Sequence, residues 1–154
     1  MSDQPPVNVS VTCQLGASAE RAFDAWLDPE MIGCWMFGPA VGDEIVVRLA
    51  VDAHVGGAFS FVVRRQDEEV EHVGKYLEIE RPRRLAFTWA VPQSTPESSR
   101  VIVDIVPLDT GCELTLTHEM HPNWADHASR TAAAWTRMLD ALAAALDEES
   151  KRPL

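Results

Sequence analysis

The residue with the clearest capacity for chemistry is His118. It alternates with Leu114, Leu116 and Met120 at a spacing of two residues, which places all four side chains on one face of a strand. An inward-facing histidine can orient a polar ligand group, or it can act as an acid or a base. It can equally be a core side chain that is hydrogen-bonded to a neighbour, as buried polar groups normally are. His118 is therefore a candidate catalytic and ligand-binding residue, with a structural role as the alternative.

A second set of candidates consists of aromatic and methionine side chains at sheet and helix spacings. Aromatic faces bind ring-bearing or fatty ligands, and flexible thioethers adapt to irregular ligand shapes. The same side chains also fill ordinary protein cores, and the sequence leaves both uses open. Together with His118, the candidate ligand-binding residues are Trp35, Phe37, Phe59, Phe61, Trp89, Met120, Trp135 and Met138.

Metal sites, phosphate sites and covalent nucleophiles find no support in the sequence. His118 and His121 do not form an HExxH motif, and they lie where a strand is expected to end. No serine lies in a GxSxG motif, and no cysteine has the histidine partner or basic surroundings of a thiolate nucleophile. Gly56 and Gly57 lack a phosphate-binding context and predict a tight turn with a positive φ angle. We expect no metal, no cofactor and no covalent catalysis.

The composition narrows the classes of partner. The chain has 154 residues and is expected to form one domain over 1–154, with frayed tails at 1–6 and 148–154. Its 13 basic and 24 acidic residues give a formal net charge of −11. Phosphate backbones and anionic lipids repel such a chain, so we expect neither a nucleic acid nor a membrane as partner. Four carboxylates at 66–71 predict a solvated hairpin.

Cysteine usage and the N-terminal residues predict a cytoplasmic location. Cys13, Cys34 and Cys112 are odd in number and far apart, which suits a reducing compartment rather than a disulfide framework. The sequence shows no signal-peptide pattern and no run of eighteen apolar residues.

The elements that must position these candidates follow from hydrophobic periodicity. Alternation of apolar and polar residues over 7–15 predicts a strand. Ser18 is an expected N-cap, and a short amphipathic helix is expected to follow it to residue 27. A second short helical turn is expected within 30–39. A 3.6-residue period over 124–146 predicts one long helix. Six further strands, joined by short turns that favour an antiparallel meander, are expected at 45–51, 59–63, 70–79, 85–91, 101–105 and 114–120.

This order of elements predicts an α+β fold. A seven-stranded, curved antiparallel sheet would wrap around the long C-terminal helix, with two short helices after the first strand. Where such a sheet grips one helix, the space between them need not fill, and ligand cavities of roughly 300–1,000 Å³ arise in such places.

Five segments, taken together, resemble a known family. They cover most of the chain and lie at 19–30 (AERAFDAWLDPE), 55–61 (VGGAFSF), 74–89 (GKYLEI and PRRLAFTW), 114–118 (LTLTH) and 134–139 (AWTRML). The sequence resembles the bacterial proteins similar to the C-terminal domain of the activator of the heat-shock-protein-90 ATPase. That family lies within the START-like (SRPBCC) helix-grip superfamily, so the resemblance implies the helix-grip fold.

Three functions remain open. The one we favour is non-enzymatic binding of a small hydrophobic or aromatic molecule in a cavity between the sheet and the C-terminal helix. A co-chaperone-like stress-response protein that stimulates a chaperone ATPase is the alternative that the family name implies. A cyclase- or hydrolase-like enzyme that uses His118 in the same cavity is the third. A homodimer through a sheet edge is a further possible partnership.

Overall fold

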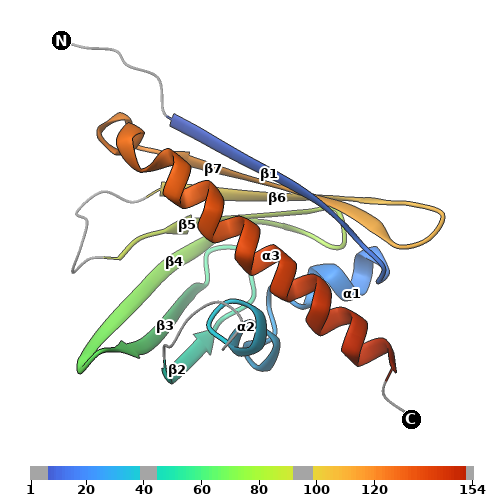
Figure 1. Ribbon diagram of the computed structural model, residues 1–154, viewed down its shortest axis with the longest axis horizontal. Helices are drawn as coiled ribbons and strands as arrows, with labels where there is room; N and C mark the ends of the chain where they lie inside the picture. Colours follow the sequence, from blue (N-terminus) through green and yellow to red (C-terminus); the bar gives the residue numbers. More distant parts are fainter. Residues whose placement is uncertain (1–6, 39–44, 92–98, 152–154) are drawn as a thin grey trace.

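Seven antiparallel strands form one sheet across a single long helix (Figure 1). The computed structural model describes residues 7–38, 45–91 and 99–151. The strand order is β1-β7-β6-β5-β4-β3-β2, so β2 to β7 each pair with their neighbours in sequence and confirm the predicted meander. The strands are β1 (Val7–Leu15), β2 (Ile45–Val51), β3 (Ala58–Arg65), β4 (Glu68–Glu80), β5 (Arg84–Trp89), β6 (Ser99–Pro107) and β7 (Cys112–Met120).

Alternation along β7 defines the inner face of the sheet. Leu114, Leu116, His118 and Met120 are buried, and the residues between them are half-buried. Val9 of β1 is also buried and pairs with His118. Because side chains alternate across a strand, this period of two turns His118 towards the interior, as predicted.

Two short helices follow β1, and each begins at a capping side chain. Helix α1 (Ala19–Asp24) begins after Ser18, whose hydroxyl oxygen accepts a hydrogen bond from the Arg21 amide at 3.2 Å. Helix α2 (Pro29–Trp35) begins after Asp28, whose carboxylate accepts from the Glu30 amide at 3.0 Å. Such caps satisfy amide groups that have no partner within the helix. The two predicted helices are thereby confirmed.

The C-terminal helix begins four residues later than predicted. A 3₁₀ helix, η1 (Pro122–His127), precedes α3 (Ala128–Lys151), so the prediction of one continuous helix from residue 124 was wrong at its start. Pro122 has no amide hydrogen to donate, and the Trp124 amide bonds to the His121 carbonyl three residues earlier, the spacing of a 3₁₀ turn. At the other end, α3 continues through 148–151, where a frayed tail was predicted, whereas 1–6 and 152–154 lie outside the described residues.

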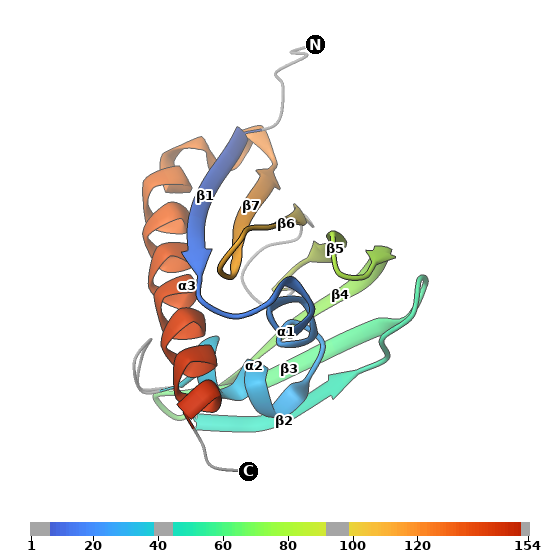
Figure 2. The ribbon, with the colours of Figure 1, turned by 90° about the vertical axis from the view of Figure 1, so that its right-hand side faces the viewer.

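The short helices and α3 divide the interior into two regions. Figure 2 shows the sheet curving from β1, beside α3, round to β2 and β3, with α1 and α2 near the C-terminal part of α3. Arg21 of α1 donates to the Leu146 carbonyl at 3.1 Å, and α2 contacts α3. The N-terminal part of α3 therefore faces the sheet without a short helix between them.

Tight turns close the hairpins where the sequence predicted them. Gly56 has a φ angle of 89°, as predicted for the Gly56-Gly57 pair. Gln66 and Asp67 join β3 to β4 with φ angles of 53° and 48°, which is the two-residue turn that suits twisted antiparallel strands. The Gln66-Asp67 turn fixes which residues of β3 and β4 face each other.

Among the helices of the described residues, none combines the length and the apolar character that a membrane crossing requires.

Candidate ligand-binding site

Aromatic rings from three adjacent strands fill the centre of the interior. Phe59 and Phe61 come from β3, Tyr76 from β4, and Phe87 and Trp89 from β5. The ring centroids of Phe59 and Phe61 are 4.7 Å apart, and those of Phe59 and Phe87 are 5.6 Å apart in an edge-on arrangement. These distances are typical of favourable aromatic pairs. Their alternate positions in each strand explain why the rings converge on one face.

A void of about 10 Å³ remains among these rings, roughly the space that a single water molecule needs. Phe59 and Phe61, which were predicted to bind a ligand, border this void rather than a ligand-sized cavity. Its lining residues are Trp26, Met36, Phe59, Phe61, Tyr76, Phe87 and Trp89.

Three other predicted ligand-binding residues pack elsewhere in the interior. Trp35 is fully buried, and its indole N–H donates to the Ala25 carbonyl at 3.0 Å. Phe37 packs edge-on against Phe61 with a centroid distance of 5.9 Å. Met120 is buried at the end of β7. The described cavities do not have Trp35, Phe37 or Met120 among their lining residues.

A larger cavity, of about 350 Å³, lies between the N-terminal part of α3 and the strands. Four predicted residues line it: Trp89, His118, Trp135 and Met138. Its wall combines aromatic and aliphatic side chains with a small number of polar ones, which is the usual character of a small-molecule site. The other lining residues are Arg65, Val70, His72, Val91, Trp124, Thr131 and Ala134.

A chain of hydrogen bonds holds His118 in the cavity wall. The indole N–H of Trp135 donates to His118 Nδ1 at 3.0 Å. Because an indole nitrogen can only donate, Nδ1 is the acceptor and the neutral ring carries its hydrogen on Nε2. Nε2 lies 2.6 Å from Ser99 Oγ, and that hydroxyl donates to the Trp89 carbonyl at 3.0 Å. The chain ties β5, β6, β7 and α3 together around one edge of the cavity.

Burial keeps His118 uncharged. Removal from solvent lowers the pKa of His118 to about 4, because a charged imidazolium is disfavoured where water is excluded. A neutral histidine with both ring nitrogens bonded orients Trp135, and the indole ring of Trp135 forms part of the cavity wall. A proton transfer at His118 would first require one of these two bonds to open.

His72 also lines the cavity and was not among the predicted residues, although its spacing in the sequence marks it. His72 follows Val70 at a spacing of two residues in β4, on the same inward face as Tyr76. It is buried, its Nδ1 lies 3.3 Å from the Phe61 carbonyl oxygen, and its ring packs 5.3 Å from that of Trp89.

Thr131 and Ala134 were also missed, although they share a helix face with Trp135 and Met138 at spacings of three and four residues. Arg65, at the tip of the β3–β4 hairpin, was missed too, although it follows Phe61 and Val63 on the inward face of β3 at spacings of two residues.

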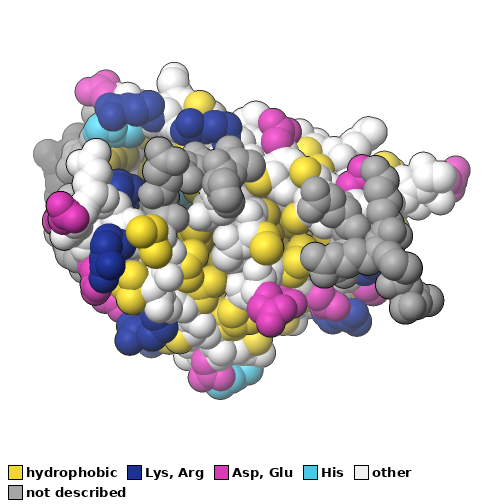
Figure 3. Space-filling view, turned by 60° about the horizontal axis from the view of Figure 1, so that its bottom comes forward, with side chains coloured by type: hydrophobic (Ala, Val, Ile, Leu, Met, Phe, Trp, Pro, Cys, Tyr) yellow, Lys and Arg dark blue, Asp and Glu magenta, His cyan; other side chains and the backbone are white. Residues whose placement is uncertain are grey.

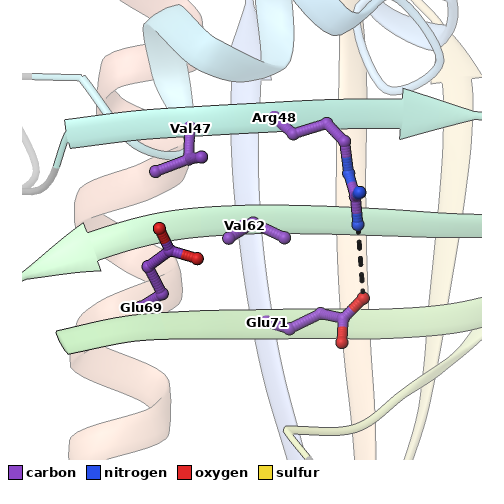
Figure 4. A pocket seen from close by; sticks show the side chains of 5 residues that line it. All are labelled: Val47, Arg48, Val62, Glu69 and Glu71. Atoms are coloured by element: carbon purple, nitrogen blue, oxygen red, sulfur yellow. Dashed lines mark ion pairs between the residues drawn. The ribbon is translucent and has the colours of Figure 1, made fainter.

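A second hollow lies on the opposite face of the sheet and has a different character. Its volume is about 490 Å³, and its lining residues are Val47, Arg48, Val62, Glu69 and Glu71. Figure 4 shows the ion pair across it, in which Arg48 lies 3.6 Å from Glu71. Both side chains are largely exposed, and such surface pairs contribute little energy. Glu69 and Glu71, two of the four carboxylates predicted to be solvated, thus lie on the outer face of the sheet. We assign the candidate site to the aromatic cavity instead.

The edge of the sheet at β2 exposes apolar side chains. Ile45 and Val47 are exposed, and β2 pairs only with β3 among the described strands. In Figure 3, hydrophobic side chains gather across the middle of the molecule's lower face, and charged side chains lie around them. The homodimer considered from the sequence stays a prediction.

Within the described residues, no three histidine, cysteine or acidic side chains are placed to hold a metal ion.

The sequence as a whole matches one protein family. Residues 16–147 match the family described as activator of Hsp90 ATPase homolog 1-like protein. The chain belongs to this family. The matched region begins just after β1 and extends through most of α3, so it includes every described element that borders the cavity. The resemblance inferred from the five segments is confirmed. A comparison with curated protein sequences found no match.

Solved structures share the fold of this AHSA1-like chain. A crystal structure of the CV1439 protein from Chromobacterium violaceum is 25% identical, with a TM-score of 0.80 over 89% of this chain and 94% of that one. The solution structure of the AHSA1-like protein from Aeromonas hydrophila is 21% identical, with a TM-score of 0.78 over 96% and 97% of the two chains. The helix-grip fold is thus shown by the family, the topology and these structures together.

Proposed function

We propose that this AHSA1-like protein binds a small hydrophobic or aromatic molecule in the 350 Å³ cavity between the sheet and α3. The observation that supports this most is the cavity's wall, in which Trp89, Trp135 and Met138 present apolar surface beside two histidines. Apolar walls with a few placed polar groups bind ligands by burying their surface and fix orientation through the polar groups.

The cavity opens to solvent, so its volume sets how much of the molecule it can bury. A water molecule occupies roughly 30 Å³ of the liquid, so 350 Å³ corresponds to roughly twelve atoms of that size. A bicyclic aromatic compound or a medium-length aliphatic chain has about this many non-hydrogen atoms. Molecules with twice as many would extend into solvent.

The hydrogen-bonded chain through His118 keeps the Trp135 side of the cavity wall in place before a ligand arrives. Trp135, His118 and Ser99 fix one another, so little side-chain motion is lost on binding. A preformed site binds more tightly than one that must be ordered by its ligand. His118 is therefore proposed as a positioning residue for Trp135.

The test is a titration of the protein with 2-ethylnaphthalene, followed by the indole N–H signals in ¹H–¹⁵N NMR spectra. Two variants of α3 are compared. Ala134 lines the cavity, so Ala134→Phe fills it, whereas Ala133 is exposed on the same helix and Ala133→Phe is the matched control. We expect saturable binding in the wild type and in A133F, and at least a tenfold weaker affinity in A134F. Equal affinity in all three proteins, or no binding to the wild type, would overturn the proposal.

A further inference from the structure

Trp26 has a buried polar atom without a partner. Its indole N–H is buried, and no acceptor among the described residues lies within hydrogen-bond distance. The residue is only 4% exposed, so solvent does not supply one. A buried donor left unbonded destabilises a protein, because it has lost its hydrogen bonds to water without gaining another. Such groups are rare, and each calls for an explanation such as a ligand or a bound water.

The unpartnered indole borders the central void. That void is about 10 Å³, enough for one oxygen atom or one water molecule. A buried water normally has two to four polar partners. The Tyr76 hydroxyl carries the only oxygen among the seven lining side chains, and no hydrogen bond joins it to Trp26. The void is therefore a poor site for water. It suits a single hydrogen-bond acceptor atom that belongs to a larger apolar molecule.

The void and the large cavity are separated by one layer of side chains. Trp89 lines both spaces. Trp135, which lines the cavity, has its ring 6.0 Å from Trp89 and 6.1 Å from Trp26. A molecule in the cavity thus lies one ring away from the Trp26 donor. Because Trp89 lines both spaces, joining them requires its ring to move.

We propose that Trp26 is the hydrogen-bond donor of the ligand site, and that the ligand is a neutral carbonyl compound with an aromatic or aliphatic body. This inference rests on the proposed function. The body occupies the 350 Å³ cavity, and the carbonyl oxygen passes Trp89 to accept from Trp26 Nε1. The acceptor is neutral because a carboxylate among these rings would lose its hydration and find no cation to replace it among the seven residues that line the void.

The experiment compares two probes of nearly equal shape, 2-acetonaphthone and 2-ethylnaphthalene, which differ in the carbonyl oxygen. In the wild type, we expect the ketone to bind about tenfold more tightly than the hydrocarbon, because it relieves the unbonded donor. We also expect the ketone, and not the hydrocarbon, to move the Trp26 indole N–H signal downfield. This second readout uses the wild type alone, so it does not depend on any variant folding.

Two variants assign the effect to Trp26. Trp26→Phe removes the N–H and is expected to abolish the preference for the ketone. Trp35→Phe is the matched control, since its ring lies 4.6 Å from that of Trp26 and its N–H is already bonded to Ala25. The preference is expected to survive in W35F.

The outcomes separate the two proposals. Equal affinities for the two probes in the wild type would overturn the role of Trp26 and leave the binding function in place. A ketone preference that persists in W26F would also overturn it. A wild type that binds neither probe would overturn both.

Discussion

The state of His118 makes the stability of the protein depend on pH in a defined window. The folded protein holds the pKa of His118 at about 4, and its reference value in the unfolded chain is 6.5. Protons therefore bind the unfolded state more tightly, and acid favours unfolding. The contribution is fully present above pH 6.5 and is lost as the pH falls from 6.5 towards 4.

The size of the effect follows from the difference between the two pKa values. Each unit of difference corresponds to about 1.4 kcal/mol, so protonation of His118 lowers the free energy of unfolding by about 3 kcal/mol once the pH is below 4. At pH 5 the loss is about 2 kcal/mol. The loss is this large because His118 is only 6% exposed.

The assay is urea denaturation of the wild type and of His118→Gln between pH 7.5 and pH 5. A glutamine side chain does not titrate, and it can still accept from Trp135 and donate to Ser99. All other residues are the same in the two proteins, so the difference in unfolding free energy isolates His118. Between pH 7.5 and pH 5, we expect the wild type to lose about 2 kcal/mol more unfolding free energy than His118→Gln does. A difference that stays constant over this range would refute the buried, neutral assignment.

Two further predictions concern close packing and thiol reactivity. In Gly74→Ala, the new Cβ would lie 1.9 Å from the Thr88 carbonyl oxygen. The free energy of unfolding, measured in urea, should therefore fall by about 3 kcal/mol or more. A fall below about 1 kcal/mol would contradict this packing. Of the three cysteines, only Cys34 is exposed, whereas burial raises the pKa of Cys13 to about 11 and also raises that of Cys112. Ellman's reagent at pH 8 should therefore modify one thiol rapidly, and Cys34→Ser should remove that fast phase; rapid modification of two or three thiols would be the contrary result.

The fold was predictable because its elements carry strong local periodicity. Alternation in β1 and β7 and the 3.6-residue period of α3 each depend on residues close in sequence. The error at residue 124 has the same origin. Trp124 continues the helical period, but a 3₁₀ turn and an α-helix present similar faces over one turn, so periodicity does not distinguish them.

The extent of the cavity was less predictable because it depends on packing between distant residues. Phe59 and Trp89 both alternate inward from neighbouring regions of the sheet, yet Phe59 borders the small central void, whereas Trp89 borders both that void and the cavity. The difference follows from the position of α1 and α2 near the C-terminal part of α3, since the cavity formed by the described residues lies under the N-terminal part. No spacing in the sequence encodes that placement. The unpartnered nitrogen of Trp26 depends on the same packing.

The measurement that tests the central claim most directly is the detection of intermolecular NOEs from bound 2-ethylnaphthalene. The proposed site predicts NOEs to the Met138 methyl group and to the ring protons of Trp135, which line the cavity. NOEs to the methyl groups of Val47 and Val62 instead would place the molecule in the outer hollow and contradict the proposed site.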